Sequence, residues 1–419
     1  MPKINAARLL SDLRRFAKFG AYRTGVHRPS YSEDDINSRR WLAEQYETAG
    51  LRSYIDGVGN VFGIPRSEER ALLIGSHAES QCYAGWLDGA LGVIYGLEIA
   101  RTFAKSPGCL DLPIATVAWA DEEGHYVPML GSRSFIGDID QEEIDRATNV
   151  DHGLPLADAL HAAGLARVPR SFIEAQRYVG YLEGHIEQGD TLESSGKRIG
   201  IVTSIVGTWQ YSIVFYGTQN HAGATRMAIR KDAGFAAAKL AMAVAESFPQ
   251  VAGPSTVWTA GRVTLEPGAP NIIPGKAEVL FQFRDAQMSV LRRLDTLLRE
   301  LVEDTALKTG CRFGILQTEA GAPSHMDLTF QEAIEDAAEH HASGAHMRMP
   351  SGAGHDAQIV AQKLSAGMVF VPSIGGISHH WTENTADEDL VLGCQVLADA
   401  AEAILRAGGK KSGAHVQER

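Results

Sequence analysis

The chain has 419 residues, of which 44% are hydrophobic and 21% charged, and its formal net charge is −12. This composition is typical of a globular protein of two or three domains and excludes a disordered or fibrous chain. The acidic balance, with no block rich in lysine and arginine, argues against nucleic acid or an anionic membrane as a partner, because phosphate binding relies on clustered cations. A small-molecule ligand is therefore expected.

The first twenty residues predict an amphipathic helix. Its apolar residues recur three or four positions apart, at Ala6, Leu9, Leu10, Leu13 and Phe16. Two arginines interrupt this segment, so no signal peptide is expected, and no stretch approaches the roughly 20 apolar residues that span a bilayer. The four cysteines are far apart and form no CxxC pair, which predicts reduced thiols. These features predict a cytoplasmic protein.

Short apolar runs alternate with helical patterns in the first half of the chain, which favours an α/β fold. The predicted elements there are a strand at 71–76, a helix at 89–104, and strands at 114–120 and 178–184. From about residue 209 the order becomes strand 209–217, helix 231–247, strands 255–266 and 276–285, helix 287–307 and strand 311–318. This β-α-β-β-α-β order fits a ferredoxin-like module of two helices on a four-stranded sheet.

After about residue 325 the first pattern resumes, with helices at 327–342 and 356–363, a strand at 367–373 and a helix at 387–407. We therefore predict an α/β protein in which residues 1–208 and 325–419 form a larger domain with a central sheet flanked by helices. Residues 209–324 form an inserted ferredoxin-like domain. The tail, 408–419, is expected to be disordered.

Residues capable of binding a metal follow four predicted strands. They are His77 and Glu79 after 71–76, Asp121, Glu122 and Glu123 after 114–120, His185 and Glu187 after 178–184, and His379 and His380 after 367–373. Ligands of open α/β sheets bind at the carboxyl ends of the strands, so one sheet would gather these residues at one edge. Asp88, just before the next predicted helix, is a fifth candidate. Nitrogen and oxygen ligands without cysteine suit zinc or manganese.

Each candidate also has a structural explanation when it is considered alone. An isolated histidine is more often hydrogen-bonded within the fold than bound to a metal, and Asp88 can be a helix cap. The acidic run at 121–124 can be a solvated helix start, and His379 and His380 can lie on a surface loop. The joint pattern favours the metal site. Of two adjacent glutamates, one can then bind metal while the other acts as general base toward a water, which makes amide-type hydrolysis the natural reaction.

The sequence contains no complete motif for nucleotide binding or for a serine hydrolase. The run GVGNVFG at 57–63 is followed by a short extended segment and Pro65 rather than by a helix, which indicates a turn and not a dinucleotide loop. The chain contains neither a GxxxxGK(S/T) motif nor a GxSxG motif, which removes the simplest nucleotide-binding and serine-hydrolase functions.

Ordered blocks of the sequence resemble a known enzyme family. The blocks are GSHAESQCYAGWLDGALG (75–92), WADEEG (119–124), LGSRSFIG (130–137), GHIEQGDTLE (184–193), NHAGATRM (220–227), PGAPNIIPG (267–275), SGAGHDAQ (351–358) and VPSIGGISHHWTE (371–383). They resemble the binuclear-metal amidohydrolases, which include N-carbamoyl-L-amino acid hydrolase, β-ureidopropionase and allantoate amidohydrolase and are related to the carboxypeptidase G and aminoacylase metallopeptidases. The resemblance runs in order from about residue 55 to about residue 390.

The resemblance implies an enzyme that removes the carbamoyl group of an N-carbamoyl amino acid and releases the amino acid, ammonia and carbon dioxide. Allantoate, or an N-acyl amino acid or dipeptide, is the alternative substrate. A non-catalytic binding protein on the same scaffold is the alternative of another class. Two divalent metal ions per subunit are implied, Zn²⁺ or in its place Mn²⁺, Co²⁺ or Ni²⁺. A homodimer is implied as well, in which the inserted domain serves for dimerisation and as a lid.

The resemblance also assigns the residues of the metal site. One metal would be held by His77, Asp88 and His185, and the second by Asp88, Glu123 and His379. Glu122 becomes the general base. Glu79 stands where the family usually has an aspartate that orients the ligand histidine, and its extra methylene alters that support. A lost partner of this kind costs about 10- to 100-fold in metal affinity or activity.

The implied substrate-binding residues are Gln188, His221, Asn271, Arg284 and His355. Arg284 suits a substrate carboxylate, because its planar guanidinium can donate two parallel hydrogen bonds. His221, in the inserted domain, would reach the neighbouring subunit's site and stabilise the developing oxyanion. His355 either lines the pocket or starts a helix. Departures from the family pattern near the expected pocket walls are His125, Arg226, His380 and Trp381, and a changed substrate or changed packing would explain them equally well.

Overall fold

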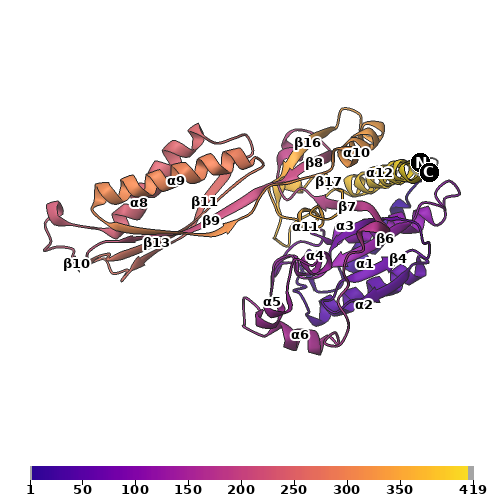
Figure 1. Cartoon of the computed structure of the whole chain (residues 1–419), viewed down its shortest axis with the longest axis horizontal. Coiled ribbons are helices and arrows are strands. Elements are labelled where there is room, and N and C mark those ends of the chain that lie inside the picture. Colours follow the sequence, from indigo (N-terminus) through magenta and orange to yellow (C-terminus); the bar gives the residue numbers. More distant parts are fainter. Residues whose placement is uncertain (1, 414–419) are drawn as a thin grey trace, which may run out of the picture. The chain divides into compact units, whose positions relative to one another are not determined.

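The structure of the chain, a computed structural model, describes residues 2–413, with side chains described up to residue 408. It divides into two compact units, one formed by Met1–Thr203 and His325–Arg419 and the other by Ser204–Ser324. Each unit has a sheet of its own (Figure 1). Each unit also has its own hydrophobic core.

The larger unit is built on a nine-stranded mixed sheet, ordered β15-β8-β17-β7-β5-β6-β4-β3, with β16 paired to β8. The strands are β3 (Arg52–Ile55), β4 (Val61–Ile64), β5 (Ala71–His77), β6 (Ile114–Trp119), β7 (Tyr178–Ile186), β8 (Ile199–Ile205), β15 (Ser324–His325), β16 (His346–Ser351) and β17 (Ala366–Val371). The four strands that precede the predicted metal ligands, β5, β6, β7 and β17, are neighbours and run parallel. Their carboxyl ends therefore lie at one edge, and the prediction that one sheet gathers them is confirmed.

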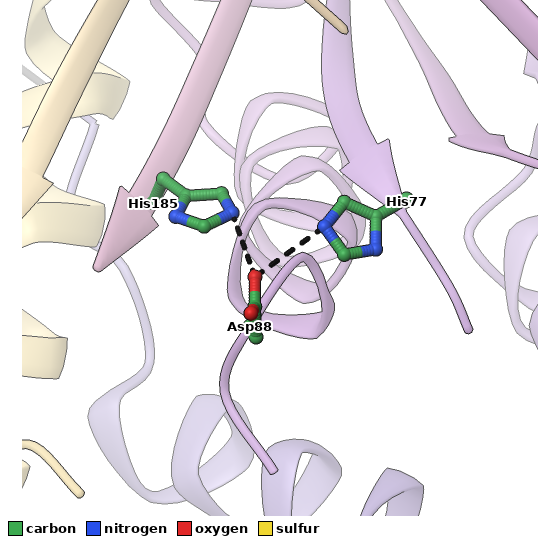
Figure 2. Close-up of side chains that lie close together, drawn as sticks. All are labelled: His77, Asp88 and His185. Atoms are coloured by element: carbon green, nitrogen blue, oxygen red, sulfur yellow. Dashed lines mark ion pairs between the residues drawn. The ribbon is translucent and has the colours of Figure 1, made fainter. Parts of the chain in front are cut away.

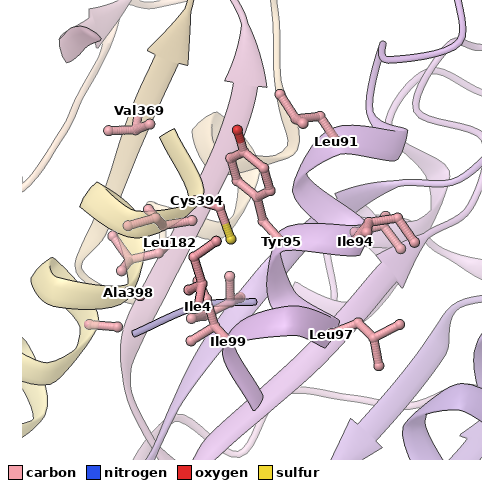
Figure 3. Packing of buried hydrophobic residues seen from close by; sticks show 14 of the residues in the cluster. Ile4, Leu91, Ile94, Tyr95, Leu97, Ile99, Leu182, Val369, Cys394 and Ala398 are labelled. Carbon is pink, nitrogen blue, oxygen red and sulfur yellow. The ribbon is translucent and has the colours of Figure 1, made fainter. Parts of the chain in front are cut away.

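The helices of the larger unit are α1 (Ala6–Phe16), α2 (Glu33–Thr48), α3 (Ala90–Phe103), α4 (Leu130–Ile136), α5 (Gln141–Arg146), α6 (Leu156–Ala162), α7 (Thr191–Ser194), α10 (Leu328–His341), α11 (Asp356–Val360) and α12 (Asp387–Gly413). Of these, α2, α3, α4, α10, α11 and α12 pack on strands of the sheet. The predicted amphipathic helix is α1, which buries Leu9, Leu13 and Phe16. Helix α3 is buried at every position, because it packs on β5, β6 and β7. Its side chains share one core with those of β7, β17 and α12 (Figure 3).

Helix α12 continues past its predicted end at residue 407 and reaches Gly413. The expectation of disorder is therefore wrong for residues 408–413, whereas 414–419 lie outside the described residues. At Gly408 the reason is tertiary, because a methyl group there would lie 3.1 Å from the side chain of Val179 at the start of β7, so the helix still lies against the sheet at this residue.

The smaller unit has the predicted β-α-β-β-α-β order. Its elements are β9 (Gly207–Tyr216), α8 (Ala233–Ser247), β11 (Val257–Glu266), β13 (Lys276–Asp285), α9 (Met288–Thr309) and β14 (Arg312–Ala320). The strands are antiparallel in the order β11-β13-β9-β14, with α8 and α9 on one face, which is a ferredoxin-like arrangement (Figure 1). Alternate residues of β13 are buried, as expected for a strand covered on one face. The predicted fold class is confirmed.

Two short ladders lie outside these sheets, β1 (Ala21–Tyr22) with β2 (Gly25–Val26) and β10 (Asn220–His221) with β12 (Ile272–Ile273). All four cysteines are free thiols, as predicted. Among residues 2–413, no helix combines the length and the apolar character needed to cross a bilayer.

Candidate metal centre

Three buried side chains meet at the carboxyl ends of β5 and β7. His77 ends β5, His185 lies near the end of β7, and Asp88 lies in the loop before α3 (Figure 2). The Nε2 atoms of His77 and His185 lie 3.4 and 3.2 Å from the same oxygen of Asp88, Oδ1. None of the three side chains is more than 3% exposed. They form a compact set of two imidazoles and one carboxylate.

Hydrogen bonds to the main chain determine which ring nitrogen faces the carboxylate. The Nδ1 atoms of His77 and His185 lie 3.1 and 2.9 Å from the carbonyl oxygens of Glu79 and Ile186. In a neutral imidazole the nitrogen that donates to a carbonyl carries the proton, so Nε2 is the atom that would present a lone pair to a cation. The Nε2 of His185 also accepts a hydrogen bond from the main-chain N–H of Gly89. Lone pairs that converge on a carboxylate oxygen in this way favour a cation between them.

The other oxygen of Asp88 belongs to a second set. Its Oδ2 lies 3.2 Å from Nε2 of His379, and the same Nε2 lies 3.8 Å from Oε2 of Glu123. Glu123 follows β6 and His379 follows β17. Gln188 donates from Nε2 to Oδ2 of Asp88 at 3.0 Å. In both sets the potential ligand atoms lie within 4.8 Å of one another, and Asp88 belongs to both sets.

Glu122 lies beside the first set. Its Oε2 is 3.7 Å from Nε2 of His77, and its side chain is only 9% exposed. Burial raises the pKa of Glu122 well above its usual range, and the negative charges of Glu123 and Asp88 add to this effect while His77 opposes it. Burial also raises the pKa of Glu123, again with a contribution from Asp88. So many carboxylates in one buried place ionise together only if positive charge is supplied.

The residues fit a pair of divalent cations. The two sets offer imidazole nitrogens and carboxylate oxygens and no thiolate, which is the ligand type of catalytic zinc and of manganese. The negative charge that they concentrate would be balanced by the ions. Glu122 lies outside these two sets, although it forms a further potential set with His77 and Glu123, so it is close enough to the centre to act on a water molecule there.

Glu79 does not orient His77 through its carboxylate. The nearest carboxylate oxygen lies 3.8 Å from Nδ1 of His77, whereas the carbonyl oxygen of Glu79 lies at 3.1 Å. The carboxylate accepts hydrogen bonds from Arg39 and from the main-chain N–H of Glu122, each at 2.6 Å. The extra methylene thus carries the carboxylate to different partners.

Two residues that the sequence analysis left unassigned support the ligands. Gln81 donates from Nε2 to the Glu123 carboxylate at 2.9 Å. Glu383, 1% exposed, accepts hydrogen bonds from the main-chain N–H of Asp88 at 3.1 Å and from the hydroxyl of Ser378 at 2.9 Å, so it joins the loop before α3 to the loop after β17. Both residues lie inside the blocks that carry the family resemblance, and that position was the available signal.

Three candidates from the sequence clusters have structural partners. Asp121 accepts hydrogen bonds from three N–H groups of the loop that follows it, at 2.7 to 3.0 Å. Glu187 accepts two from the start of α7, at 2.7 and 2.8 Å. The Nδ1 of His380 lies 2.7 Å from the hydroxyl of Thr382. Among the described residues, none of these candidates belongs to a potential metal set. Asp121 is buried and the next helix begins only at Leu130, so the expectation of a solvated helix start is wrong for this residue.

His355 starts a helix, as one of its two explanations predicted, and its part in a substrate pocket stays a prediction. It immediately precedes α11, and its ring lies beside that of His185, with a distance of 4.4 Å between centroids. The side chain is buried, and its Nε2 lies 2.9 Å from the hydroxyl of Ser351.

The other predicted substrate residues belong to the smaller unit. His221 and Asn271 are exposed and lie together at the β10–β12 ladder, where the N–H of Ala222 donates to the carbonyl of Asn271 at 2.9 Å. The Nε of Arg284 donates to the side chain of Gln282 at 2.9 Å. Their part in a substrate site stays a prediction.

The departures from the family pattern lie in different surroundings. His125 is buried, with Nδ1 3.0 Å from the hydroxyl of Ser30, whereas its Nε2 has no hydrogen-bond partner among the described residues. The rings of His380 and Trp381 lie 3.9 Å apart, and the guanidinium of Arg23 lies 4.3 Å from the Trp381 ring. Arg226 is exposed on the smaller unit.

A sheet edge that brings two histidine–carboxylate sets together around a shared aspartate, with a further glutamate beside them, is the site of a metal-dependent hydrolase. The chain belongs to peptidase family M20/M25/M40, whose sequence profile matches residues 79–403. The family relationship predicted from the sequence blocks is thereby confirmed.

Known relatives span almost the whole chain. The chain is 32% identical to an N-carbamoyl-L-amino-acid amidohydrolase of Paenarthrobacter aurescens, over 97% of this chain and 100% of the relative. It is 30% identical to an allantoate amidohydrolase of Bacillus subtilis, over 95% and 97%. A crystal structure of an amidase of the hydantoinase/carbamoylase family from Burkholderia phymatum is similar with a TM-score of 0.92 and 45% identity, covering 97% of this chain and 99% of that one.

Proposed function

We propose that the chain is a two-metal amidohydrolase that removes the carbamoyl group from N-carbamoyl-L-amino acids. The observation that carries the proposal is the pair of ligand sets that share Asp88. The name of the P. aurescens relative supports the substrate. Allantoate is the second candidate, because relatives of similar identity are named allantoate amidohydrolase. Both compounds carry a ureido group near a carboxylate, so the same residues would serve for either.

The two cations would share Asp88 and take their other ligands separately in this proposal. One would be held by His77, Asp88 and His185 and the other by Asp88, Glu123 and His379. Zinc is the metal proposed, with manganese, cobalt or nickel as substitutes, because the donors are nitrogen and oxygen of intermediate softness. When bound, such ions polarise a carbonyl oxygen and lower the pKa of a nearby water.

The chain's own residues would then move the proton. Glu122 takes a proton from the water that attacks the ureido carbon and passes it to the amino acid nitrogen as the C–N bond breaks. The amino acid leaves, and the carbamic acid decomposes to ammonia and carbon dioxide. Gln188, which lies 3.0 Å from Asp88, and the buried His355 would line the bound ureido group.

The remaining substrate contacts would come from the smaller unit. Arg284 would pair with the substrate carboxylate through two parallel hydrogen bonds, and Asn271 would bind a polar group of the substrate. His221 of the neighbouring subunit would donate to the developing oxyanion. This arrangement requires a homodimer.

An exposed strand supports the homodimer. β11 is the edge strand of its sheet, and Val257, Val263 and Leu265 on it are 56%, 52% and 40% exposed. Exposed apolar edge strands are pairing surfaces that proteins usually cover. A second copy of the chain would cover this one. The free cysteines fit the reducing cytoplasm, where we propose that the enzyme acts.

The decisive experiment replaces the proposed base. Glu122→Gln keeps the size of the side chain but removes its basicity, so kcat should fall by about 10²- to 10⁴-fold while two metal ions per subunit stay bound. Glu142→Gln, on the exposed face of α5, is the matched control. It should change neither kcat nor the number of bound metal ions. Near-normal turnover in the Glu122 variant would overturn the assignment.

Product analysis identifies the substrate. With an N-carbamoyl-L-amino acid, ammonia and the free amino acid should appear in equal amounts. An N-acyl amino acid would yield a carboxylic acid without ammonia. If only allantoate were hydrolysed, allantoate would replace the N-carbamoyl amino acid as the proposed substrate.

A further inference from the structure

A buried arginine, Arg39, is linked through Glu79 to residues of the candidate metal centre. The side chain of Arg39, on α2, is 0% exposed. Its guanidinium donates to the carboxylate of Asp35 at 3.0 Å, to the carbonyl oxygens of Gly59 and Trp119 at 3.0 Å each, and to the carboxylate of Glu79 at 2.6 Å. One side chain thus joins α2, the turn before β4, the end of β6 and the segment after β5.

The contact with Glu79 leads directly to two residues of the centre. One carboxylate oxygen of Glu79 accepts from Arg39, and the other accepts from the main-chain N–H of Glu122 at 2.6 Å. The carbonyl oxygen of Glu79 lies 3.1 Å from Nδ1 of His77. Any displacement of Glu79 therefore moves the proposed base and one proposed ligand together.

A purely stabilising ion pair would not need this arrangement. Arg39 already has a carboxylate partner one helical turn away, Asp35, so a second carboxylate is not required to neutralise it. Buried ion pairs also contribute little net stability compared with well-packed apolar side chains. The additional hydrogen bonds to Trp119 and Gly59 place the guanidinium between the end of β6, which leads to Glu122, and the turn before β4.

We propose that Arg39 is a positioning residue of the hydrolase: through Glu79 it sets the main chain at Glu122 and the ring of His77. The inference rests on the roles proposed above for Glu122 and His77. It also explains how this chain accommodates glutamate at position 79. The longer side chain reaches the guanidinium, and the carbonyl group takes over the support of the imidazole.

The first test compares Arg39→Lys with Arg40→Lys. Lysine keeps the charge at position 39, but a single ammonium group cannot reproduce four hydrogen bonds from a planar fork. We expect kcat to fall by about 10- to 100-fold with KM changed by less than about twofold, because a positioning defect acts on the reaction and not on substrate binding. Arg40 is exposed on the same helix, and its variant should behave as the wild type.

Glu79→Gln tests the pathway. The amide keeps the length of the side chain, but its single oxygen cannot accept hydrogen bonds from both Arg39 and the main-chain N–H of Glu122, so its effect should match that of Arg39→Lys. The double variant should lose no more activity than either single variant, since both act through one contact. Fully additive losses, or full activity in both single variants, would overturn the proposal.

A cobalt readout separates this inference from the proposed function. Titration of metal-free protein with Co²⁺ needs no substrate, and its visible absorption reports ligand geometry. The Arg39 and Glu79 variants should bind Co²⁺ about 10-fold more weakly, with an altered spectrum and unchanged circular dichroism. An unaltered spectrum and affinity would refute the positioning role even if no carbamoyl substrate were found. A failure to hydrolyse any such substrate with cobalt binding altered as expected would refute only the proposed function.

Discussion

At the scale of single residues, Asp56 and Asn60 explain why the glycine-rich run resembling a dinucleotide loop is a turn. Asp56 accepts hydrogen bonds from the main-chain N–H groups of Asn60 at 2.9 Å and Ser171 at 3.1 Å. The side chain of Asn60 accepts from the N–H of Ala120 at 3.0 Å, just after β6. The turn is therefore tied to the sheet edge that carries the metal centre, and no helix follows it.

Asp56 should make stability depend on pH. Burial raises its pKa from 3.8 to about 6, although four N–H groups oppose the shift. Below pH 3.8 both the folded and the unfolded state are protonated; between 3.8 and 6 only the unfolded state loses the proton, so stability falls as pH rises. Compared with the Asp56→Asn variant, the wild type should lose roughly 3 kcal/mol of its free energy of unfolding between pH 3.8 and pH 6. Above pH 6 the two proteins should show no further difference from this group. Urea unfolding at a series of pH values checks the difference, and parallel curves for the two proteins would contradict it.

At the scale of elements, α3 matters because it follows Asp88 directly. A methyl group at Gly92 would lie 2.5 Å from the carbonyl oxygen of Gly184 and 2.7 Å from Cβ of Ser76. Glycine at this position therefore allows the helix to approach β5 and β7 closely. The distance between α3 and the sheet in turn sets how far Asp88 lies from the carboxyl ends of β5 and β7.

Gly92→Ala should destabilise the protein, although a change from glycine to alanine within a helix usually stabilises it. Alanine in a helix normally stabilises by about 0.5 to 1 kcal/mol, but here the added methyl group should cost about 1 to 3 kcal/mol through overpacking. Metal affinity should fall as well, because Asp88 moves with the helix. Denaturant unfolding and zinc titration measure both effects. Gly108→Ala is the control, since the nearest atom to its added methyl group lies 4.0 Å away, and equal stability of the two variants would disprove the argument.

At the scale of the whole molecule, the two units have separate cores, and both candidate metal sets lie in the larger one. Calorimetry of the full chain should show two transitions, of which added zinc raises only one. By mass action, a ligand at 1,000 times its Kd contributes about 4 kcal/mol to the state that binds it. His77→Ala should abolish most of this shift. A zinc effect on both transitions, or on neither, would speak against a metal centre confined to the larger unit.

The proposed exchange of His221 between subunits is tested by mixing variants. His221→Ala and Glu122→Gln should each have little activity alone, whereas co-expressed subunits should form hybrids with one complete site. Recovered turnover in the purified mixture is the expected result. Absence of recovery, with hybrid dimers demonstrated by differential tagging, would show that His221 does not act across an interface.

Much of the fold could be predicted because its signals are local. Apolar runs and helical periodicity give the order of elements, and the carboxyl ends of parallel strands necessarily share one edge. That geometry is enough to bring His77, His185 and His379 together from distant positions. The extension of α12 could not be predicted from its terminal residues, because it depends on a contact with β7.

The sequence by itself determined which chemical groups lie at the sheet edge, because it shows which residues follow each predicted strand. Only the tertiary structure decided which neighbour faces the centre: Glu122 and Glu123 but not Asp121, and His379 but not His380. The physical reason is the backbone after each strand. Asp121 and His379 adopt left-handed φ angles of 55° and 54°, which turn successive side chains in directions that spacing cannot reveal. The partnership of Arg39 with Glu79 likewise exists only where α2 packs behind the strands.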